Sequence, residues 1–304
     1  MAPLKIHFDY HTPPHADVVA RGFDAHRFAS ELAKLGCQVV YFFAKDVFGN
    51  CYWDTRVGFK HPHLSRDLLG EVVEAARARG LEVVAYYNAM DLINAKRHPE
   101  WRHRGSPEAP GSEGFYVCFN SPWLERVFLP ELEELLRYGI SGLFFDFLYV
   151  HQPCFCDWCE ARYERERGLK LPRGPSEPGW AEYLEWWRGV GEEVLERTLS
   201  FVGARRPDVA VSVNWAYTPR QPGIPPHELR SLVLDPHETD CPVLNISYHA
   251  RYWGWLGKPF DVYVTRFLRW WGDYGLKPLA ELLAECATAI ANGASVIVGD
   301  HLYV

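Results

Sequence analysis

Three cysteines lie within six positions of one another in the segment HQPCFCDWC, at Cys154, Cys156 and Cys159. The spacing C-x-C-x-x-C is typical of sites where thiolates bind a soft metal ion such as Zn²⁺, and a closed tetrahedral site needs a fourth ligand. Cys118, in YVCFNSPW, is expected one helix–strand unit earlier on the same side of the fold. Four thiolates would leave no open position, so the sequence predicts a structural zinc site, with free thiols in a reduced loop as the alternative.

A carboxylate precedes these cysteines, in the strand-like run GLFFDFLYV. Asp146 is the one charged residue of this run and has apolar neighbours on both sides. An ionised carboxylate in such surroundings is costly unless it is hydrogen-bonded or used in chemistry. Asp146 is therefore the leading candidate for a catalytic residue, and a structural aspartate that ties a loop to the strand is the alternative.

The residues that must position these groups form a regular alternation of strand and helix patterns. Apolar, β-branched and aromatic runs predict strands at residues 4–11, 38–46, 81–89, 142–150, 208–217, 231–238, 261–267 and 294–302. Helical patterns cover residues 24–36, 64–80, 121–138, 178–204 and 277–291, and less clearly 241–257. The alternation predicts parallel strands that close into a (β/α)8 TIM barrel, an α/β fold, as a single domain over residues 1–304. A doubly wound open sheet would be supported by a GxGxxG loop after the first strand, and the sequence there has none.

The last predicted strand ends close to the last residue, so we expect the eighth helix of the barrel to be missing. That helix normally covers the seam between the eighth and the first strand. We expect the seam to be covered either by further chain, if this sequence is a fragment of a longer protein, or by another subunit.

In a barrel of this kind the functional site lies at the carboxyl ends of the strands. Those ends supply carboxylates, amides, cations and aromatic rings, a mixture that suits a sugar, because rings stack on its C–H faces and short polar groups bind its hydroxyls. The candidate substrate-binding residues are His11, Lys45, Tyr87, Asn214, Trp215, Arg266, Trp270, Trp271 and His301.

Hydrolysis of a glycosidic bond generally needs two carboxyl groups, and a separation of about 5–5.5 Å makes one of them a nucleophile and gives retention of configuration. The segment LDPHETD follows the sixth predicted strand and contains Asp235 and Glu238. We pair Glu238, as the acid/base, with Asp146, as the nucleophile, and keep Asp235 as the reserve acid/base.

Several segments together resemble a family of (β/α)8 glycoside hydrolases, the α-L-fucosidase-like glycosidases, which often carry a β-galactosidase-type trimerisation domain. The segments are FFDFLYVHQPCFCDWC, YVCFNSPW, HPEW (98–101), DYHTP (9–13) and FFAKDVFGNCYW (42–53), and the resemblance covers nearly all of the chain. It implies a retaining hydrolase that acts on a terminal sugar, α-L-fucose first, with Asp146 as the nucleophile on the fourth strand.

The cysteine pattern also resembles the zinc cluster of family 42 β-galactosidases, which implies a metal on Cys118, Cys154, Cys156 and Cys159. That family has an Asn–Glu pair on the fourth strand, whereas Phe145 precedes Asp146 here, so its chemistry is not carried over. The other functions kept open are a non-catalytic carbohydrate-binding barrel, a β-galactosidase-like glycosidase of other sugar specificity, and a metal-dependent hydrolase with an open zinc site.

Composition limits the partners and the compartment. The net charge of −7 disfavours a nucleic-acid partner, and no apolar run approaches the roughly 18 residues that span a bilayer. The N-terminal residues lack the apolar core of a signal peptide, and the cysteine usage suits a reducing compartment. We expect a cytoplasmic protein with a carbohydrate substrate, no membrane or nucleic-acid partner and no organic cofactor, which forms a homo-oligomer, with a trimer as one candidate.

Overall fold

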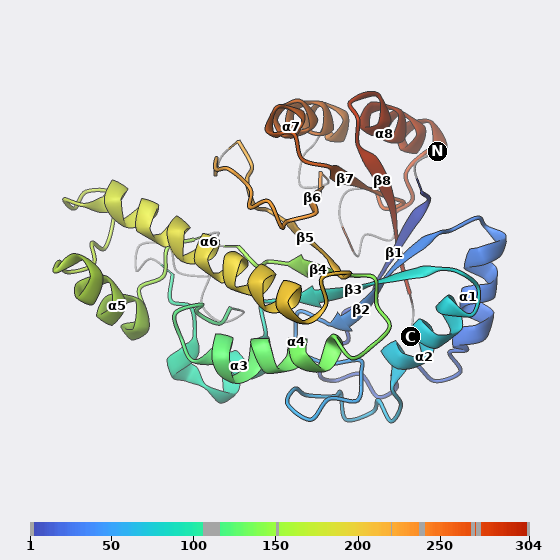
Figure 1. The fold of residues 1–304 in the computed structure, drawn as a ribbon, viewed down its shortest axis with the longest axis horizontal. Helices are drawn as coiled ribbons and strands as arrows, with labels where there is room; N and C mark the ends of the chain where they lie inside the picture. Colours follow the sequence, from blue (N-terminus) through green and yellow to red (C-terminus); the bar gives the residue numbers. More distant parts are fainter. Residues whose placement is uncertain are drawn as a thin grey trace.

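The architecture is a closed barrel of parallel strands surrounded by helices (Figure 1). The computed structural model describes residues 3–105, 116–149, 152–219, 221–236, 241–268, 271 and 275–302. Within these residues eight strands pair in the order β1-β2-β3-β4-β5-β6-β7-β8, and β8 pairs with β1 to close the barrel. The predicted (β/α)8 TIM barrel is confirmed.

The strands lie where the apolar runs predicted them. They are β1 (Lys5–Asp9), β2 (Val39–Lys45), β3 (Glu82–Asn88), β4 (Gly142–Asp146), β5 (Ala210–Asn214), β6 (Ser231–Leu234), β7 (Phe260–Thr265) and β8 (Ser295–His301). Each lies inside its predicted run, except that β7 begins one residue earlier. Strands of a parallel barrel are covered on both faces, which is why their sequences are nearly continuous apolar runs.

The helices that cover the barrel are α1 (Ala25–Lys34), α2 (Leu68–Arg77), α4 (Leu129–Leu135), α6 (Trp180–Arg205), α7 (Pro242–Leu256) and α8 (Leu279–Ala291). Asp24 caps α1, because its carboxylate accepts a hydrogen bond from the Arg27 backbone N–H at 3.0 Å. Asp67 caps α2 in the same way, through the Gly70 backbone N–H at 2.9 Å.

Two features of the helical layer differ from the prediction. Residues 121–138, predicted as one helix, contain the π-helical turn η2 (Leu124–Phe128) followed by α4, and the short elements α3 (Leu92–Arg97), η1 (Pro99–Trp101) and α5 (Asp157–Arg167) were not predicted. Short helices carry too few turns for a clear apolar stripe, and α5 is rich in charged residues. In the described residues no helix lies between β5 and β6.

Apolar side chains remain exposed along α7 and α8, which lie next to each other (Figure 1). The largest are Leu244, Tyr248 and Trp255 on α7 and Leu279, Leu283 and Ile290 on α8. Within each helix the spacing places them along one side. Patches of this kind often mark interaction surfaces, and the homo-oligomer stays a prediction. None of the helices in the described chain is both long enough and apolar enough to cross a membrane.

A fully buried ion cluster joins the barrel to the helices. Lys45, at the end of β2, places its Nζ 2.8 Å from an oxygen of Asp91 and 2.8 Å from an oxygen of Glu131 on α4. Tyr87 of β3 donates a hydrogen bond to Glu131 at 2.5 Å, and Trp123 donates one to Asp91 at 2.7 Å. One cation thus serves two buried carboxyls, and the cluster ties β2, β3 and α4 together.

We expect the substitution Lys45→Met to destabilise the fold strongly, because it leaves the two buried carboxyls without their cation. Removing one partner of a buried ion pair costs about 3–5 kcal/mol. Urea unfolding would measure the loss. Lys34→Met is the matched control: Lys34 pairs with Glu31 at the surface, where its side chain is 68% exposed, and its removal should leave the midpoint nearly unchanged. Equal midpoints for the two variants would contradict the assigned role of the cluster.

Candidate active site at the barrel mouth

Asp146 is the last residue of β4, at the carboxyl end of the barrel as expected, although the strand ends there and does not continue to residue 150 as predicted. The strand stops there because Phe147 adopts a left-handed backbone conformation with φ of 59°. Side chains that end a strand at this face of a TIM barrel point toward the mouth where such folds bind ligands. The structure therefore places the leading catalytic candidate in the expected position.

Both oxygens of the Asp146 carboxylate accept hydrogen bonds from neutral donors. Oδ1 accepts from Asn214 Nδ2 at 2.6 Å and from Trp215 Nε1 at 3.3 Å. Oδ2 accepts from the Tyr86 hydroxyl at 2.5 Å and from Asn88 Nδ2 at 3.1 Å. Four donors directed at one carboxylate are an arrangement that binds the ionised form.

Two opposing effects act on the pKa of Asp146. Burial raises the pKa, because the charged form is less well solvated in the barrel. Hydrogen bonds from Tyr86, Asn214 and Trp215, together with the charge of His11, lower it. Burial is the larger effect, so the pKa of Asp146 is raised overall, and the donors offset part of the cost of the ionised form that a nucleophile needs.

A cavity of about 460 Å³ opens above Asp146 at the barrel mouth. The predicted residues that line it are His11, Asp146, Asn214, Trp215, Asp235, Trp271 and His301. Asp235, the reserve acid/base, follows β6 and accepts a hydrogen bond from Trp271 Nε1 at 3.3 Å. Together with Asp9 at the end of β1, the cavity thus holds three carboxyl groups and two indole rings from five different strand ends.

Asp9 and two histidines form a second polar group in this cavity, which sequence reasoning did not select as a unit. Asp9 Oδ1 lies 3.3 Å from His11 Nε2, and Asp9 Oδ2 lies 3.3 Å from His301 Nε2. His11 Nδ1 accepts a hydrogen bond from the Val47 backbone N–H at 3.0 Å, so the proton of a neutral His11 lies on Nε2, toward Asp9. Burial raises the pKa of Asp9, but the histidines lower it overall, so an ionised Asp9 orients both rings.

The floor of the cavity is closed by residues that point into the barrel. His7 contacts the Tyr263 hydroxyl at 3.2 Å, and its ring packs against Phe43 and Tyr86. Burial lowers the pKa of His7 to about 3, so its ring is neutral at physiological pH. The floor is uncharged and aromatic, which excludes water from below Asp146.

Three predicted substrate contacts are not at this cavity. Lys45 and Tyr87 belong to the buried ion cluster and have no exposed surface, so the prediction that they bind substrate is wrong for this conformation. Successive residues of a strand face opposite sides of the sheet, so Tyr86 faces the mouth and Tyr87 does not. The pairing of β2 with β3 shifts register between Phe43 and Lys45, and the side chain of Lys45 points outward there. Arg266 forms an ion pair with Asp300 and lies outside the cavity lining. The predicted residues Glu238 and Trp270 lie outside the described residues.

The four predicted metal ligands do come together. The Sγ atoms of Cys118, Cys154, Cys156 and Cys159 all lie within 4.8 Å of one another, all four side chains are buried, and none forms a disulfide. Asn120 donates from its backbone N–H to Cys118 Sγ at 3.4 Å and from its side chain to Cys159 Sγ at 3.2 Å. Hydrogen bonds to sulfur of this kind support metal-bound thiolates, so the group could hold one metal ion.

The cysteine cluster lies apart from the cavity that holds Asp146. None of the four cysteines lines that cavity. Cys159 belongs to α5, which packs against α6 through the rings of Tyr163 and Trp186 and lies away from the barrel in Figure 1. A metal held by four thiolates here would have no ligand position for water, which fits a structural role.

Comparisons with known proteins agree with a glycoside-hydrolase-like barrel. A family model described as hypothetical glycosyl hydrolase 6 matches residues 24–147. α-L-Fucosidase isoenzyme 2 from Paenibacillus thiaminolyticus is 25% identical, with a TM-score of 0.82 over 100% of this chain and 46% of that one. This chain therefore spans less than half the length of that fucosidase.

Two further solved structures share the fold. The glycoside hydrolase domain of PgaB (BpsB) from Bordetella bronchiseptica has a TM-score of 0.72 at 16% identity, over 98% of this chain and 94% of that one. An α-L-fucosidase from Bacteroides thetaiotaomicron has a TM-score of 0.53 at 18% identity, over 92% of this chain and 55% of that one. No curated protein matches the sequence.

The substitution Tyr86→Phe should raise the pKa of Asp146, because it removes a hydrogen bond that stabilises the charged carboxylate. The check is a pH titration by ¹³C NMR of protein with labelled aspartate carboxyls, with Asp146→Asn used to identify the signal. Tyr10→Phe is the control, since the buried Tyr10 hydroxyl donates to the Phe43 carbonyl. A pKa of Asp146 that is the same in the wild type and in Tyr86→Phe would show that the bond does not stabilise the ionised form.

Proposed function

We propose that this protein is a retaining glycoside hydrolase that removes a terminal sugar, α-L-fucose first, with Asp146 as the nucleophile. The observation that carries the proposal is the Asp146 carboxylate, hydrogen-bonded through both oxygens at the end of β4 and facing a cavity of sugar-binding composition. The likeness to α-L-fucosidase isoenzyme 2 over the whole of this chain supports the choice of sugar.

In the proposed reaction Asp146 attacks the anomeric carbon of the sugar. The bond to the leaving oxygen breaks as a second carboxyl group gives that oxygen a proton, which leaves the sugar bound covalently to Asp146. The second carboxylate then takes a proton from water, the water attacks the anomeric carbon, and Asp146 is released. Asp235 lines the cavity and can fill this second role; Glu238 stays the predicted alternative.

The remaining cavity residues would bind the sugar. Trp215 and Trp271 offer faces for its C–H surface, while His11 and His301, oriented by Asp9, offer polar atoms for its hydroxyls. Asn214 would act through Asp146, because its amide donates directly to the carboxylate. A cytoplasmic location is part of the proposal and rests on the sequence alone.

A hydrolase of other sugar specificity is the second candidate. The observation that favours it is the match with the PgaB glycoside hydrolase domain, which covers nearly all of both chains. A panel of aryl glycosides separates the two candidates, and a chain that cleaves none of them would be a carbohydrate-binding barrel.

We also propose that Cys118, Cys154, Cys156 and Cys159 hold a structural Zn²⁺. Soft thiolates at tetrahedral spacing favour zinc among the common divalent ions. The ion would fix the segment around Cys118 to the segment that carries the other three cysteines. It would thereby stabilise the loops beside the barrel mouth and take no part in the hydrolysis.

Elemental analysis of purified protein should find about one zinc per chain. Cys156→Ser should lower both the zinc content and the midpoint of thermal unfolding, because it removes one of four ligands and loosens the joined segments. Cys241→Ser, at an exposed cysteine outside the cluster, is the control and should change neither. Protein without zinc, with the four clustered thiols free to titrate, would rule the metal out.

Asp146→Ala should lower the turnover of 4-nitrophenyl α-L-fucoside by about a thousandfold or more, while sugar binding remains measurable. Added azide should restore part of the rate, because the anion fits the space of the lost carboxylate, and the product should then be β-L-fucosyl azide. The control is Asp54→Ala, at a carboxylate that is 69% exposed. Wild-type turnover in Asp146→Ala would remove Asp146 from the mechanism.

A further inference from the structure

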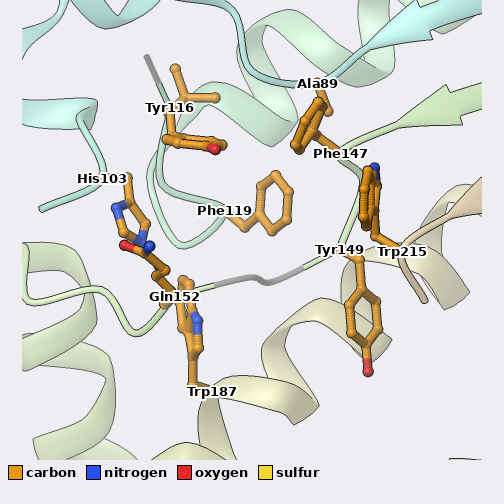
Figure 2. Close-up of a pocket in the computed structure, with 10 residues that line it drawn as sticks. Ala89, His103, Tyr116, Phe119, Phe147, Tyr149, Gln152, Trp187 and Trp215 are labelled. Carbon is orange, nitrogen blue, oxygen red and sulfur yellow. The ribbon is translucent and has the colours of Figure 1, made fainter. Parts of the chain in front are cut away.

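Figure 2 shows a second cavity, of about 340 Å³, which shares two lining residues with the cavity that holds Asp146. Phe147 and Trp215 line both cavities, and their rings lie nearly parallel with centroids 6.1 Å apart. Trp215 Nε1 also donates to Asp146 Oδ1 at 3.3 Å. The wall shared by the two cavities is therefore hydrogen-bonded to the candidate nucleophile, and the two cavities lie on either side of it.

The second cavity has the composition of a ring-binding site. Aromatic side chains from separate parts of the chain line it, among them Tyr116, Phe119 and Trp187 of α6, together with the shared Phe147 and Trp215. Figure 2 shows Phe147 and Trp215 on one side, with His103 and Gln152 on the opposite side. Flat apolar faces beside a few polar groups suit the C–H faces and hydroxyls of a pyranose.

Three buried polar atoms of this lining have no hydrogen-bond partner in the described chain: His103 Nδ1, Trp187 Nε1 and the Tyr149 hydroxyl oxygen. The Tyr149 hydroxyl points away from the other lining side chains in Figure 2, which leaves His103 Nδ1 and Trp187 Nε1. The other ring nitrogen of His103 lies 3.0 Å from the Gln152 carbonyl oxygen, which can only accept, so the proton lies on Nε2 and Nδ1 is an acceptor. Trp187 Nε1 can only donate. A hydroxyl both donates and accepts, so sugar hydroxyls can satisfy both atoms, which are costly to leave unpaired.

The two residues of the shared wall, Phe147 and Trp215, both have a strained backbone conformation. Phe147 has a φ of 59° and Trp215 a φ of 62°, in the left-handed region that is unfavourable for residues with a side chain. Such conformations persist where the surrounding structure fixes them, and they cluster at ligand sites. Here they occur at two residues from different strand ends that meet at one wall.

We propose that the second cavity is the leaving-group subsite, which binds a second pyranose ring attached to the sugar held at Asp146. This inference rests on the proposed function and names the class of substrate: a glycoside whose leaving group is itself a sugar ring, as in an oligosaccharide. Trp187, Tyr116 and Phe119 would contact the ring faces, and His103 would accept a hydrogen bond from a hydroxyl.

The test compares two neighbouring tryptophans of α6 that are equally buried. Trp187 is 5% exposed and lines the second cavity, whereas Trp186 is 6% exposed and does not. Trp187→Ala and Trp186→Ala would each be assayed with 4-nitrophenyl α-L-fucoside, whose leaving group is a ring, and with α-L-fucosyl fluoride, whose leaving group is a single atom. The measured quantity is the ratio of the two kcat/KM values.

Trp187→Ala should lower this ratio by about tenfold, because the lost stacking affects only the substrate with a ring. Trp186→Ala should change the ratio by less than about twofold, even if it lowers both rates through a loss of stability. Equal ratios for the two variants would overturn the proposal. If circular dichroism shows that Trp187→Ala does not fold, the second variant is Gln152→Ala, at an exposed side chain that lines the same cavity. Gln152→Ala is expected to lower the ratio of kcat/KM values by about threefold, and an unchanged ratio would overturn the proposal.

Failure of the proposed function is separable from failure of this inference. If the wild type hydrolyses neither substrate, the fucosidase proposal fails. Calorimetric titration with D-glucose and N-acetyl-D-glucosamine then tests whether the second cavity binds a pyranose ring. Binding that Trp186→Ala keeps and Trp187→Ala loses would support a pyranose site. The absence of binding to the wild type would overturn it.

Discussion

A carboxylate buried at the end of β4 has to be hydrogen-bonded, and this requirement accounts for much of the barrel mouth. Asn88 pairs in register with Asp146 across the β3–β4 ladder, so the parallel sheet itself brings one donor to the carboxylate. Tyr86 adds a second donor from β3, and Asn214, which ends β5, adds a third from the other side. The chemistry proposed for Asp146 depends on the registers of three adjacent strands more than on any flexible loop.

The same strand also connects the mouth to the helical layer. Tyr86 and Tyr87 are consecutive residues of β3 whose hydroxyls point to opposite sides of the sheet: one donates to Asp146 inside the barrel, and the other donates to Glu131 outside it. The buried cluster of Lys45, Asp91 and Glu131 therefore fixes the outer face of the strand that carries two of the donors. The strand β3 therefore contributes both to the stability of the outer helical layer and to the geometry of the site around Asp146.

The sequence predicts the features that depend on composition and spacing. Buried parallel strands are continuous apolar runs, so all eight strands were located. Asp146 was selected because it is the lone aspartate in such a run. The spacing of the thiols, with Cys118 nearby, pointed to the four cysteines that the structure brings together. The sequence could not say whether Tyr86 or Tyr87 faces inward, because one residue of register reverses every side chain. For the same reason Lys45 was assigned to the wrong face, and Asp9 could not be recognised as the group that orients His11 and His301. The second cavity depends on long-range contacts between Tyr116, Trp187 and Trp215, which no local pattern reveals.

The position of the cysteine cluster separates two parts of the molecule. Cys118 stands between Val117 and Phe119, which both line the second cavity, and Cys154 follows Gln152, at its rim, by two residues. Asp146 and its donors belong to β3, β4 and β5 or to the residue just after β5, whereas the cysteines lie in segments outside the strands. Substitutions near the cysteine cluster can thus reshape the adjoining part of the second cavity while Asp146 keeps its hydrogen-bond donors. If the proposed roles hold, the preference for a leaving group can diversify among descendants of one ancestor while the proposed catalytic site at Asp146 is kept.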